Sequence, residues 1–465
     1  MTRAQQGIQI FWQQLPGPGL VRWASAFFSL SVLSFLLSVA AAQTFLSLSG
    51  VCYAIDLLRR PRAPAFPPIK LPMALFCFFT MLSIGWAENP VIGWTAVRKL
   101  TLFVIILLTV NLMASERHVT RIYQVMFVES AIAGLVAAVQ FVLEYREVRV
   151  AHPSQFYYYM TLFRIHGFMG HWMTFGGQQM LVSIALLAYL LPSAPPRPST
   201  EAGNAAPAGQ ASGLQLQPAR VFSPSKLWWI VLGIVALSIV LNFTRGVWIG
   251  CSLAAIYLVA RWRPRLLWTL PVLLVTGYLA APSLLRERLG TVFHPSADPA
   301  IAVRFEMWHV GLAMIRRHPL VGVGPNNINE VYLAYLPPRT QPVAAWHEHL
   351  HDVYLQLAAE RGLPCLAAWL WLMGALGWQI LRIRRRLSRE GRSTWLVDAS
   401  LAGWLAFMAE GWFEFNFGTT PVLMVLLFLV STPFAAERMI GARRPSPGAS
   451  RHPLPVGEGE PQGGG

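Results

Sequence analysis

Three histidines on alternating positions, His347, His349 and His351, lie in the segment AWHEHLHDVYLQLAAERGLP at residues 345–364. With Glu348 they match the HExxH pattern, in which two histidines one helical turn apart bind zinc and the glutamate activates a zinc-bound water. That chemistry needs a helix that begins before the first histidine, and the loop-like composition there argues against one. We therefore favour His351 as a general base, because an imidazole with the usual histidine pKa of about 6.5 accepts a proton from a hydroxyl at neutral pH.

Arginines in unusual surroundings form a second set of candidates. Arg245 lies in a short turn, LNFTRGVWIG, between two apolar segments, where a charge is costly unless it has a function. An arginine that extends its charge to the membrane surface is the structural alternative. Arg164, in LFRIHGFMGHW, precedes another apolar segment and has His166 and His171 nearby, although an ordinary interfacial loop would carry the same residues.

Arg304 belongs to the segment IAVRFEMWHVGLAMIRR, whose apolar residues repeat with the period of an amphipathic helix. Trp308 lies one turn further along and shares a helix face with Arg304, whereas Glu306, two residues from Arg304, is poorly placed to form an ion pair with it on that face. We therefore expect an external partner for Arg304, with Trp308 in a supporting role.

The composition gives the setting of these residues. Of 465 residues, 55% are hydrophobic and only 12% are charged, which indicates an integral membrane protein. The four cysteines lie within apolar stretches and predict small buried side chains rather than disulfides. The net charge of +16 comes from arginine clusters between apolar segments, so it indicates membrane orientation rather than nucleic-acid binding. No cleavable signal peptide is evident, and the first apolar segment is expected to remain as a span.

Apolar segments long enough, or nearly long enough, to cross the roughly 30 Å of membrane hydrocarbon occur about twelve times. The tenth contains Glu360, Arg361, Gly362 and Pro364, which predicts a helix that breaks or enters at an angle. The predicted spans are residues 23–40, 43–58, 71–87, 99–114, 123–143, 175–191, 227–243, 246–261, 266–282, 353–381, 395–413 and 420–437.

The distribution of positive charge predicts the orientation. If both termini are cytoplasmic, the cytoplasmic segments hold 24 of the 37 Lys and Arg residues, as the positive-inside rule requires. We therefore expect an all-α polytopic membrane protein of about twelve transmembrane helices, with a long, partly helical periplasmic loop. The predicted order is a cytoplasmic N-terminus (1–22), helices one to six (23–191) with a periplasmic loop (144–174), a disordered cytoplasmic linker (192–226), helices seven to nine (227–282), a large periplasmic loop (283–352), helices ten to twelve (353–437) and a disordered cytoplasmic tail (438–465).

This topology places the candidate histidines and arginines on the periplasmic side. Several arginines around one outer chamber suit a phosphate-rich ligand, because guanidinium groups bind phosphate oxygens bidentately and stay charged. A pyrophosphate-linked lipid fits this position, with its headgroup at the outer surface and its chain among the helices. The sequence gives no firm role to two carboxylates near the end of the eleventh span, Glu410 and Glu414.

The stretch HDVYLQLAAERGLPC resembles the signature of the O-antigen ligases and their relatives, the O-antigen polymerases and the O-linked oligosaccharyltransferases. That signature is a histidine, then Asn, Ser or Gln, then nine residues and a glycine. His351 and Gly362 fit this spacing. Asp352 departs from it, although an aspartate can still hydrogen-bond or orient the imidazole.

Three further segments resemble parts of the same family in the same order. They are FRIHGFMGHWMTFGG at 163–177, TRGVWIG at 244–250 and RFEMWHVGLAMIRRHPLVGVGPNN at 304–327, so the resemblance covers about residues 160–365.

The resemblance implies a metal-independent, inverting glycosyl transfer on the periplasmic face of the bacterial inner membrane, without a cofactor. A glycan on undecaprenyl pyrophosphate would pass to a hydroxyl of the lipid A-core oligosaccharide. His351 would activate or position that hydroxyl. Arg245, Arg304 and Arg164 would stabilise the departing pyrophosphate. Residues with possible supporting roles are Trp308, Asp352, His349 and His171.

Other functions share parts of this pattern. An O-antigen polymerase uses the same lipid-linked donor, and a protein O-oligosaccharyltransferase differs in accepting a Ser or Thr hydroxyl. A transporter or flippase is the non-enzyme alternative, but it predicts polar residues spread along the spans, whereas here they gather in outward loops. A zinc metalloprotease would depend on Glu348, which the glycosyl transfer does not need.

Overall fold

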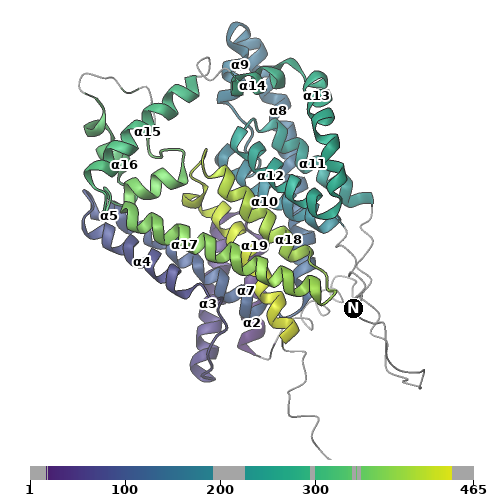
Figure 1. Ribbon diagram of the computed structural model, residues 1–465, viewed down its shortest axis with the longest axis vertical. Helices are drawn as coiled ribbons and strands as arrows, with labels where there is room; N and C mark the ends of the chain where they lie inside the picture. Colours follow the sequence, from purple (N-terminus) through teal and green to yellow (C-terminus); the bar gives the residue numbers. More distant parts are fainter. Residues whose placement is uncertain are drawn as a thin grey trace, which may run out of the picture.

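The computed structural model describes residues 17, 19–191, 226–293, 299–337, 342 and 347–441. Most of the predicted N-terminal segment, nearly all of the linker and most of the tail lie outside these residues. The described part is a helical bundle without strands (Figure 1). Its α-helices are α2 (Leu20–Leu33), α3 (Val39–Arg59), α4 (Lys70–Gly85), α5 (Pro90–Trp94), α6 (Val97–Leu100), α7 (Val104–Leu112), α8 (Glu116–Ala151), α9 (Phe156–Leu162), α10 (Trp172–Leu190), α11 (Lys226–Leu241), α12 (Arg245–Trp262), α13 (Leu270–Ala280), α14 (Ser283–Phe293), α15 (Pro299–Arg317), α16 (Ile328–Val331), α17 (Val353–Arg389), α18 (Trp395–Glu410) and α19 (Thr420–Gly441).

Every predicted span overlaps a helical segment of the described chain. Six of these segments are both long and apolar enough to cross a membrane, and four more apolar helices are shorter. The protein is therefore a multi-pass membrane protein, while the count of twelve spans and the orientation stay predictions. The six are α3, Pro90–Leu112, α8, α10, α17 and α19. Some boundaries differ from the prediction. The predicted span 23–40 is interrupted, since α2 ends at Leu33 and α3 begins at Val39. In addition, α8 continues to Ala151 and makes the first part of the 144–174 loop helical.

The centre of the bundle is formed by α10 and α19, most of whose residues are buried. Figure 1 shows α18 beside them, with α17 extending along α4. Two glycines let α12 pack closely on α18. A Cβ atom at Gly250 would lie 2.9 Å from the Ala406 carbonyl oxygen, and one at Gly246 would lie 3.0 Å from Phe413 Cβ. This GxxxG contact brings Arg245, the first residue of α12, next to the chain that follows α18.

The predicted break in the tenth span is confirmed at Gly362, whose φ of 81° is left-handed. Pro364 has no N–H to donate to the Glu360 carbonyl four residues earlier. That carbonyl instead accepts from Ser83 Oγ and from the backbone N–H of Gly324, both at 2.9 Å. The backbone of residues 319–324 thus replaces the helical hydrogen bonds that α17 loses at the break.

This exchange explains two motifs of the sequence together. Val323 N–H donates to the Ala359 carbonyl at 2.9 Å, and Leu363 N–H donates to the Pro319 carbonyl at 2.8 Å. A side chain at Gly362 would collide with the Leu320 backbone, and one at Gly322 would collide with the Glu360 backbone. Gly322 of HPLVGVG and Gly362 of the histidine signature are therefore both required where the backbones of these two segments are in contact.

Candidate active site

His351 is held by a carboxylate from a distant part of the chain. Its Nδ1 lies 2.9 Å from Oε2 of Glu414, in the loop between α18 and α19. The other oxygen of Glu414 accepts from Nη2 of Arg304 on α15, at 2.8 Å. The Glu414 side chain is 1% exposed, whereas those of His351 and Arg304 are each 23% exposed. One buried carboxylate thus fixes two partly accessible groups.

The same contacts decide the charge of Glu414. Burial alone would raise the pKa of this carboxyl, but the nearby Arg304 and His351 outweigh burial and hold the pKa below its usual value. Glu414 is therefore ionised at neutral pH. An ionised carboxylate can only accept, so Nδ1 of His351 must carry the proton in this hydrogen bond. In the neutral ring, Nε2 is then the nitrogen with the lone pair.

The backbone also holds His351 in an unusual conformation. His351 has a φ of 51°, in the left-handed region that residues other than glycine seldom adopt. The next residue, Asp352, caps α17 by accepting from Leu355 N–H at 2.8 Å. Val353 N–H donates to the Gly411 carbonyl at 2.7 Å, which ties the start of α17 to the loop that carries Glu414.

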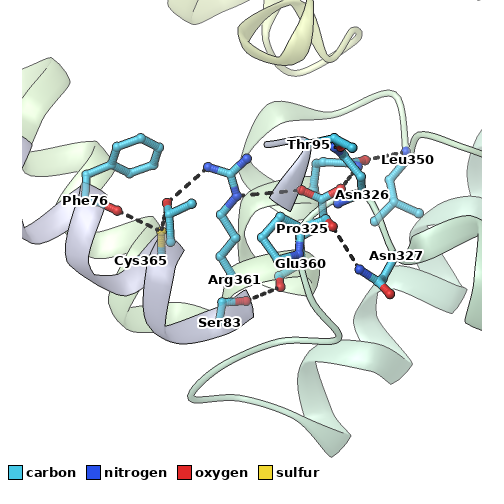
Figure 2. Close-up of polar contacts among 12 residues, drawn as sticks. Phe76, Ser83, Thr95, Pro325, Asn326, Asn327, Leu350, Glu360, Arg361 and Cys365 are labelled. Carbon is cyan, nitrogen blue, oxygen red and sulfur yellow. Dashed lines mark hydrogen bonds and ion pairs between the residues drawn. The ribbon is translucent and has the colours of Figure 1, made fainter. Parts of the chain in front are cut away.

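A buried chain of hydrogen bonds links this turn to the break in α17. Leu350 N–H donates to Oε1 of Gln356 at 2.7 Å, and the Gln356 amide donates to Oε1 of Glu360 at 2.8 Å. Oε1 of Glu360 also accepts from Asn326 N–H at 2.9 Å. Figure 2 shows Leu350, Asn326 and Glu360 converging from three segments. The 318–327 segment therefore supports the residue before His351 through two side chains.

Arg164 lies between the bridged pair and two further arginines. Arg164 lies within electrostatic range of Arg288, Glu414, Arg304 and Arg245, and burial together with these cations lowers its pKa to about 9. Its guanidinium carbon is 3.9 Å from the centre of the Trp172 ring, and its Nε donates to the Thr161 carbonyl at 2.6 Å. The structure thus brings together all three arginines that the sequence predicts.

The elements that carry these arginines are fastened to each other. The Asn242 amide nitrogen donates to the carbonyls of Ile165 and Trp172, at 3.0 and 3.1 Å, and Asn242 Oδ1 accepts from the Thr244 hydroxyl. These hydrogen bonds join the turn before α12 to the loop before α10. They place Arg245 and Arg164 on the same side of the bundle.

Arg288 on α14 was not identified from the sequence. It is 3% exposed, and its Nε donates to the Phe243 carbonyl at 3.3 Å. Its neighbour Arg286 is exposed, so the burial of one arginine in SLLRERLG is decided by packing. Glu414 was noticed in the sequence without a role, and no local signal connects it with His351.

The position of Glu414 changes what the sequence suggested about two residues. Asp352 does not orient His351, because its carboxylate caps α17 and Glu414 takes the Nδ1 position. Arg304 has a partner within the protein, because Glu414 accepts from it, while the expected external partner stays a prediction. Spacing along the sequence argued against Glu306 as the partner of Arg304, and Glu306 accepts from the Tyr332 hydroxyl at 3.0 Å. Spacing could not identify Glu414, which lies 110 positions from Arg304.

Of the remaining supporting candidates, His349 and His171 lie within electrostatic range of His351. His349 packs against Phe415 with ring centres 5.4 Å apart, and burial lowers its pKa. Nδ1 of His171 accepts from Met173 N–H at 3.2 Å, and burial is also the main reason that its pKa is lowered. The indole nitrogen of Trp308 is buried and has no hydrogen-bond partner among the described residues.

The zinc arrangement is not formed by the described residues. The chain from His347 to Asp352 is not helical, since α17 begins only at Val353. His347 stacks on Tyr332 with ring centres 4.4 Å apart, while His351 bonds Glu414. Among the residues that can be described, no three His, Cys, Asp or Glu side chains form a group that could hold a metal.

A comparison with known proteins matches the part of the chain that carries several of these residues. A family model described as O-antigen ligase matches residues 230–370, a region that includes Arg245, Arg304, His351 and the Gly362 break. Arg164 and Glu414 lie outside the matched region. No curated protein matches the chain. The match confirms the resemblance at the histidine signature and at the segments around Arg245 and Arg304, and it supports assignment of the chain to the O-antigen ligase family.

Proposed function

We propose that this protein is an O-antigen ligase of the bacterial inner membrane. It transfers O-antigen polysaccharide from undecaprenyl pyrophosphate to a hydroxyl of the lipid A-core oligosaccharide, with its active site on the periplasmic face. The observation that carries the proposal is the Arg304–Glu414–His351 bridge beside Arg164, which also lies within electrostatic range of Arg245 and Arg288. It combines a proton acceptor with cations suited to a pyrophosphate.

In this reaction, His351 accepts the proton of the acceptor hydroxyl at Nε2. The hydroxyl oxygen forms a bond to the anomeric carbon on the face opposite the leaving group, so the configuration inverts. The bond between the anomeric carbon and the pyrophosphate oxygen breaks, and its electrons remain on the lipid pyrophosphate. Glu414 keeps the Nδ1 proton of His351 in place and stabilises the imidazolium that forms.

The arginines receive the negative charge that develops on the pyrophosphate. Arg164, Arg245 and Arg304 were predicted for this role, and we add Arg288 because it is buried beside Arg164. Fixed guanidinium groups in a site with little water stabilise developing charge without having to reorganise. They also keep their charge without a metal ion, so the proposed transfer is metal-independent.

The test is reconstitution of the purified protein with a lipid-pyrophosphate glycan and three separate acceptors. These are lipid A-core, a second lipid-linked glycan and a Ser/Thr peptide. We expect product on lipid A-core alone, with the same rate when a chelator is present. Product on the lipid-linked glycan would instead show a polymerase, and product on the peptide an O-oligosaccharyltransferase.

The substitution that tests the base is His351→Asn, because asparagine tolerates the left-handed backbone and can still donate to Glu414. We expect a folded, membrane-inserted protein that transfers no glycan. Glu348→Gln serves as the matched control, since it removes the glutamate that a zinc protease would require and leaves His351 intact. Normal transfer by His351→Asn, or loss of transfer in Glu348→Gln, would contradict the assignment.

A further inference from the structure

A second cationic site lies at the other end of the helices that build the active site. A cavity of about 40 Å³ lies between the ends of α10, α12 and α17 and the start of α18. Both α12 and α17 begin at the active site and end at this cavity. The 19 residues of α10, a candidate membrane span that begins beside Arg164 and also ends at this cavity, correspond to about 28 Å of helix, close to the thickness of the membrane hydrocarbon. The cavity therefore belongs to the opposite membrane surface.

The residues that line the cavity carry more positive than negative charge. Arg261, Arg384 and Arg392 line it, and among the described residues Asp398 is the one acidic residue that does so. The Asp398 carboxylate is already used, because it accepts from Arg384 Nε, from the Thr394 hydroxyl at 2.7 Å and from Tyr257. The cavity is therefore left with a surplus of positive charge.

The exposure of these arginines divides them into two roles. The Arg384 side chain is 11% exposed and is fixed against Asp398. Arg392 is 46% exposed and has Glu390 at 3.3 Å, an acidic group outside the cavity wall. Arg261 is exposed at the end of α12. Arg384 is thus held in place within the cavity wall, whereas the exposed side chains of Arg261 and Arg392 can contact a ligand from the edge of the cavity.

The size and the surroundings of the cavity indicate what it holds. A volume of about 40 Å³ is several times the roughly 10–15 Å³ that one water needs, so it admits a phosphate-sized group. Trp262 and Trp395 also line it, and tryptophan favours the headgroup level of a membrane. Basic pockets between helix ends bind anionic lipid headgroups on the cytoplasmic side, which is the side that the charge distribution predicts here.

We propose that this cavity, formed by Arg261, Arg384 and Arg392, binds the phosphate group of an anionic phospholipid of the cytoplasmic leaflet. The site is separate from the glycosyl-transfer site and does not depend on its function. By composition the segment between residues 192 and 225 is a poor anionic ligand, since Glu201 is its one acidic residue and two arginines accompany it.

The experiment compares the full-length protein in nanodiscs of phosphatidylcholine with and without phosphatidylglycerol. We expect phosphatidylglycerol to raise the thermal unfolding midpoint. The double variant Arg261→Gln/Arg392→Gln should bind the lipid about tenfold or more weakly, as expected for two lost arginine contacts. Arg384 is left intact, because its removal would leave Asp398 without its cation.

The matched control is Arg382→Gln/Arg385→Gln, which removes two exposed charges from the same end of α17 without touching the cavity wall. Its lipid response should equal that of the wild type. Equal losses in the two double variants would show diffuse attraction and overturn the pocket. Protection by millimolar inorganic phosphate without any effect of the lipid would overturn the lipid as the source of the phosphate.

Discussion

Nδ1 of His351 lies 2.9 Å from Oε2 of Glu414, although 63 positions separate the two residues in the chain. The loop after α18 thus supplies the group that fixes the tautomer of the histidine. The same carboxylate neutralises part of the charge of Arg304. Proton transfer and charge stabilisation therefore share one buried residue.

Glu414→Gln should lower the turnover number of glycan transfer on the order of 100-fold or more. The glutamine can still accept from Arg304, but its amide would donate to Nδ1 of His351 and place the ring proton on Nε2, where the hydroxyl proton must go. Glu410→Gln is the control, because it changes a second buried carboxyl in the same region whose Oε1 can still accept from Asn416. Equal rates in the two variants would refute the role of Glu414.

Arg288→Lys should reduce transfer about tenfold to 100-fold, because lysine lacks the planar fork that binds two phosphate oxygens. The measurement is the turnover number with the lipid-linked donor at saturation. Arg286→Lys makes the same change two residues earlier on α14, at an exposed position, and should retain the wild-type rate. If Arg288→Lys is as active as Arg286→Lys, Arg288 does not contact the donor.

Gln356→Met should lower the turnover number about tenfold to 100-fold while the KM values for donor and acceptor stay close to normal. Methionine has a similar volume but cannot accept from Leu350 or donate to Glu360, so the turn that holds His351 is displaced from its productive position. Gln379→Met on the same helix, outside this hydrogen-bond chain, is the control. A proportional loss in both variants would indicate general destabilisation.

Gly362→Ala should destabilise the protein by about 2 kcal/mol or more. The alanine would have to adopt a φ of 81° and its Cβ would collide with the Leu320 backbone. Gly374→Ala, further along α17, meets no atom within 4 Å and should leave the thermal unfolding midpoint unchanged or slightly raised. Similar midpoints for the two variants would show that the two backbones do not meet closely at Gly362.

Asp352→Asn should change how stability depends on pH. Burial raises the pKa of Asp352 to about 6, against the effect of its hydrogen bonds from the backbone. Between the unfolded pKa near 3.8 and this folded value, the folded state holds the extra proton, so wild-type stability falls as pH rises through that window.

Asparagine caps a helix as well as aspartate does and has no proton to lose. At pH 7 to 8, Asp352→Asn should therefore gain up to about 3 kcal/mol relative to the wild type. The measurement is the unfolding midpoint of both proteins from pH 4 to pH 8. Curves that run parallel over this range would rule out a shifted pKa at Asp352.

The amino-acid sequence by itself determined where the helical segments lie. Apolar composition and residue period are local properties, so they located the apolar helical segments, the helix around Arg304 and the break near Gly362. Residue type also singled out His351, Arg245 and Arg164, because buried or interfacial charges are rare in membrane segments.

Only the tertiary structure decided which of these groups meet. Glu414 lies 63 positions from His351 and 110 from Arg304, and helix packing, rather than spacing along the chain, brings such carboxylates to their partners. For the same reason, Asp352 became a helix cap, Arg288 rather than Arg286 became buried, and HPLVGVG came to occupy the break in α17. A hydrogen bond acts over about 3 Å in space, and a sequence encodes that distance only through the fold.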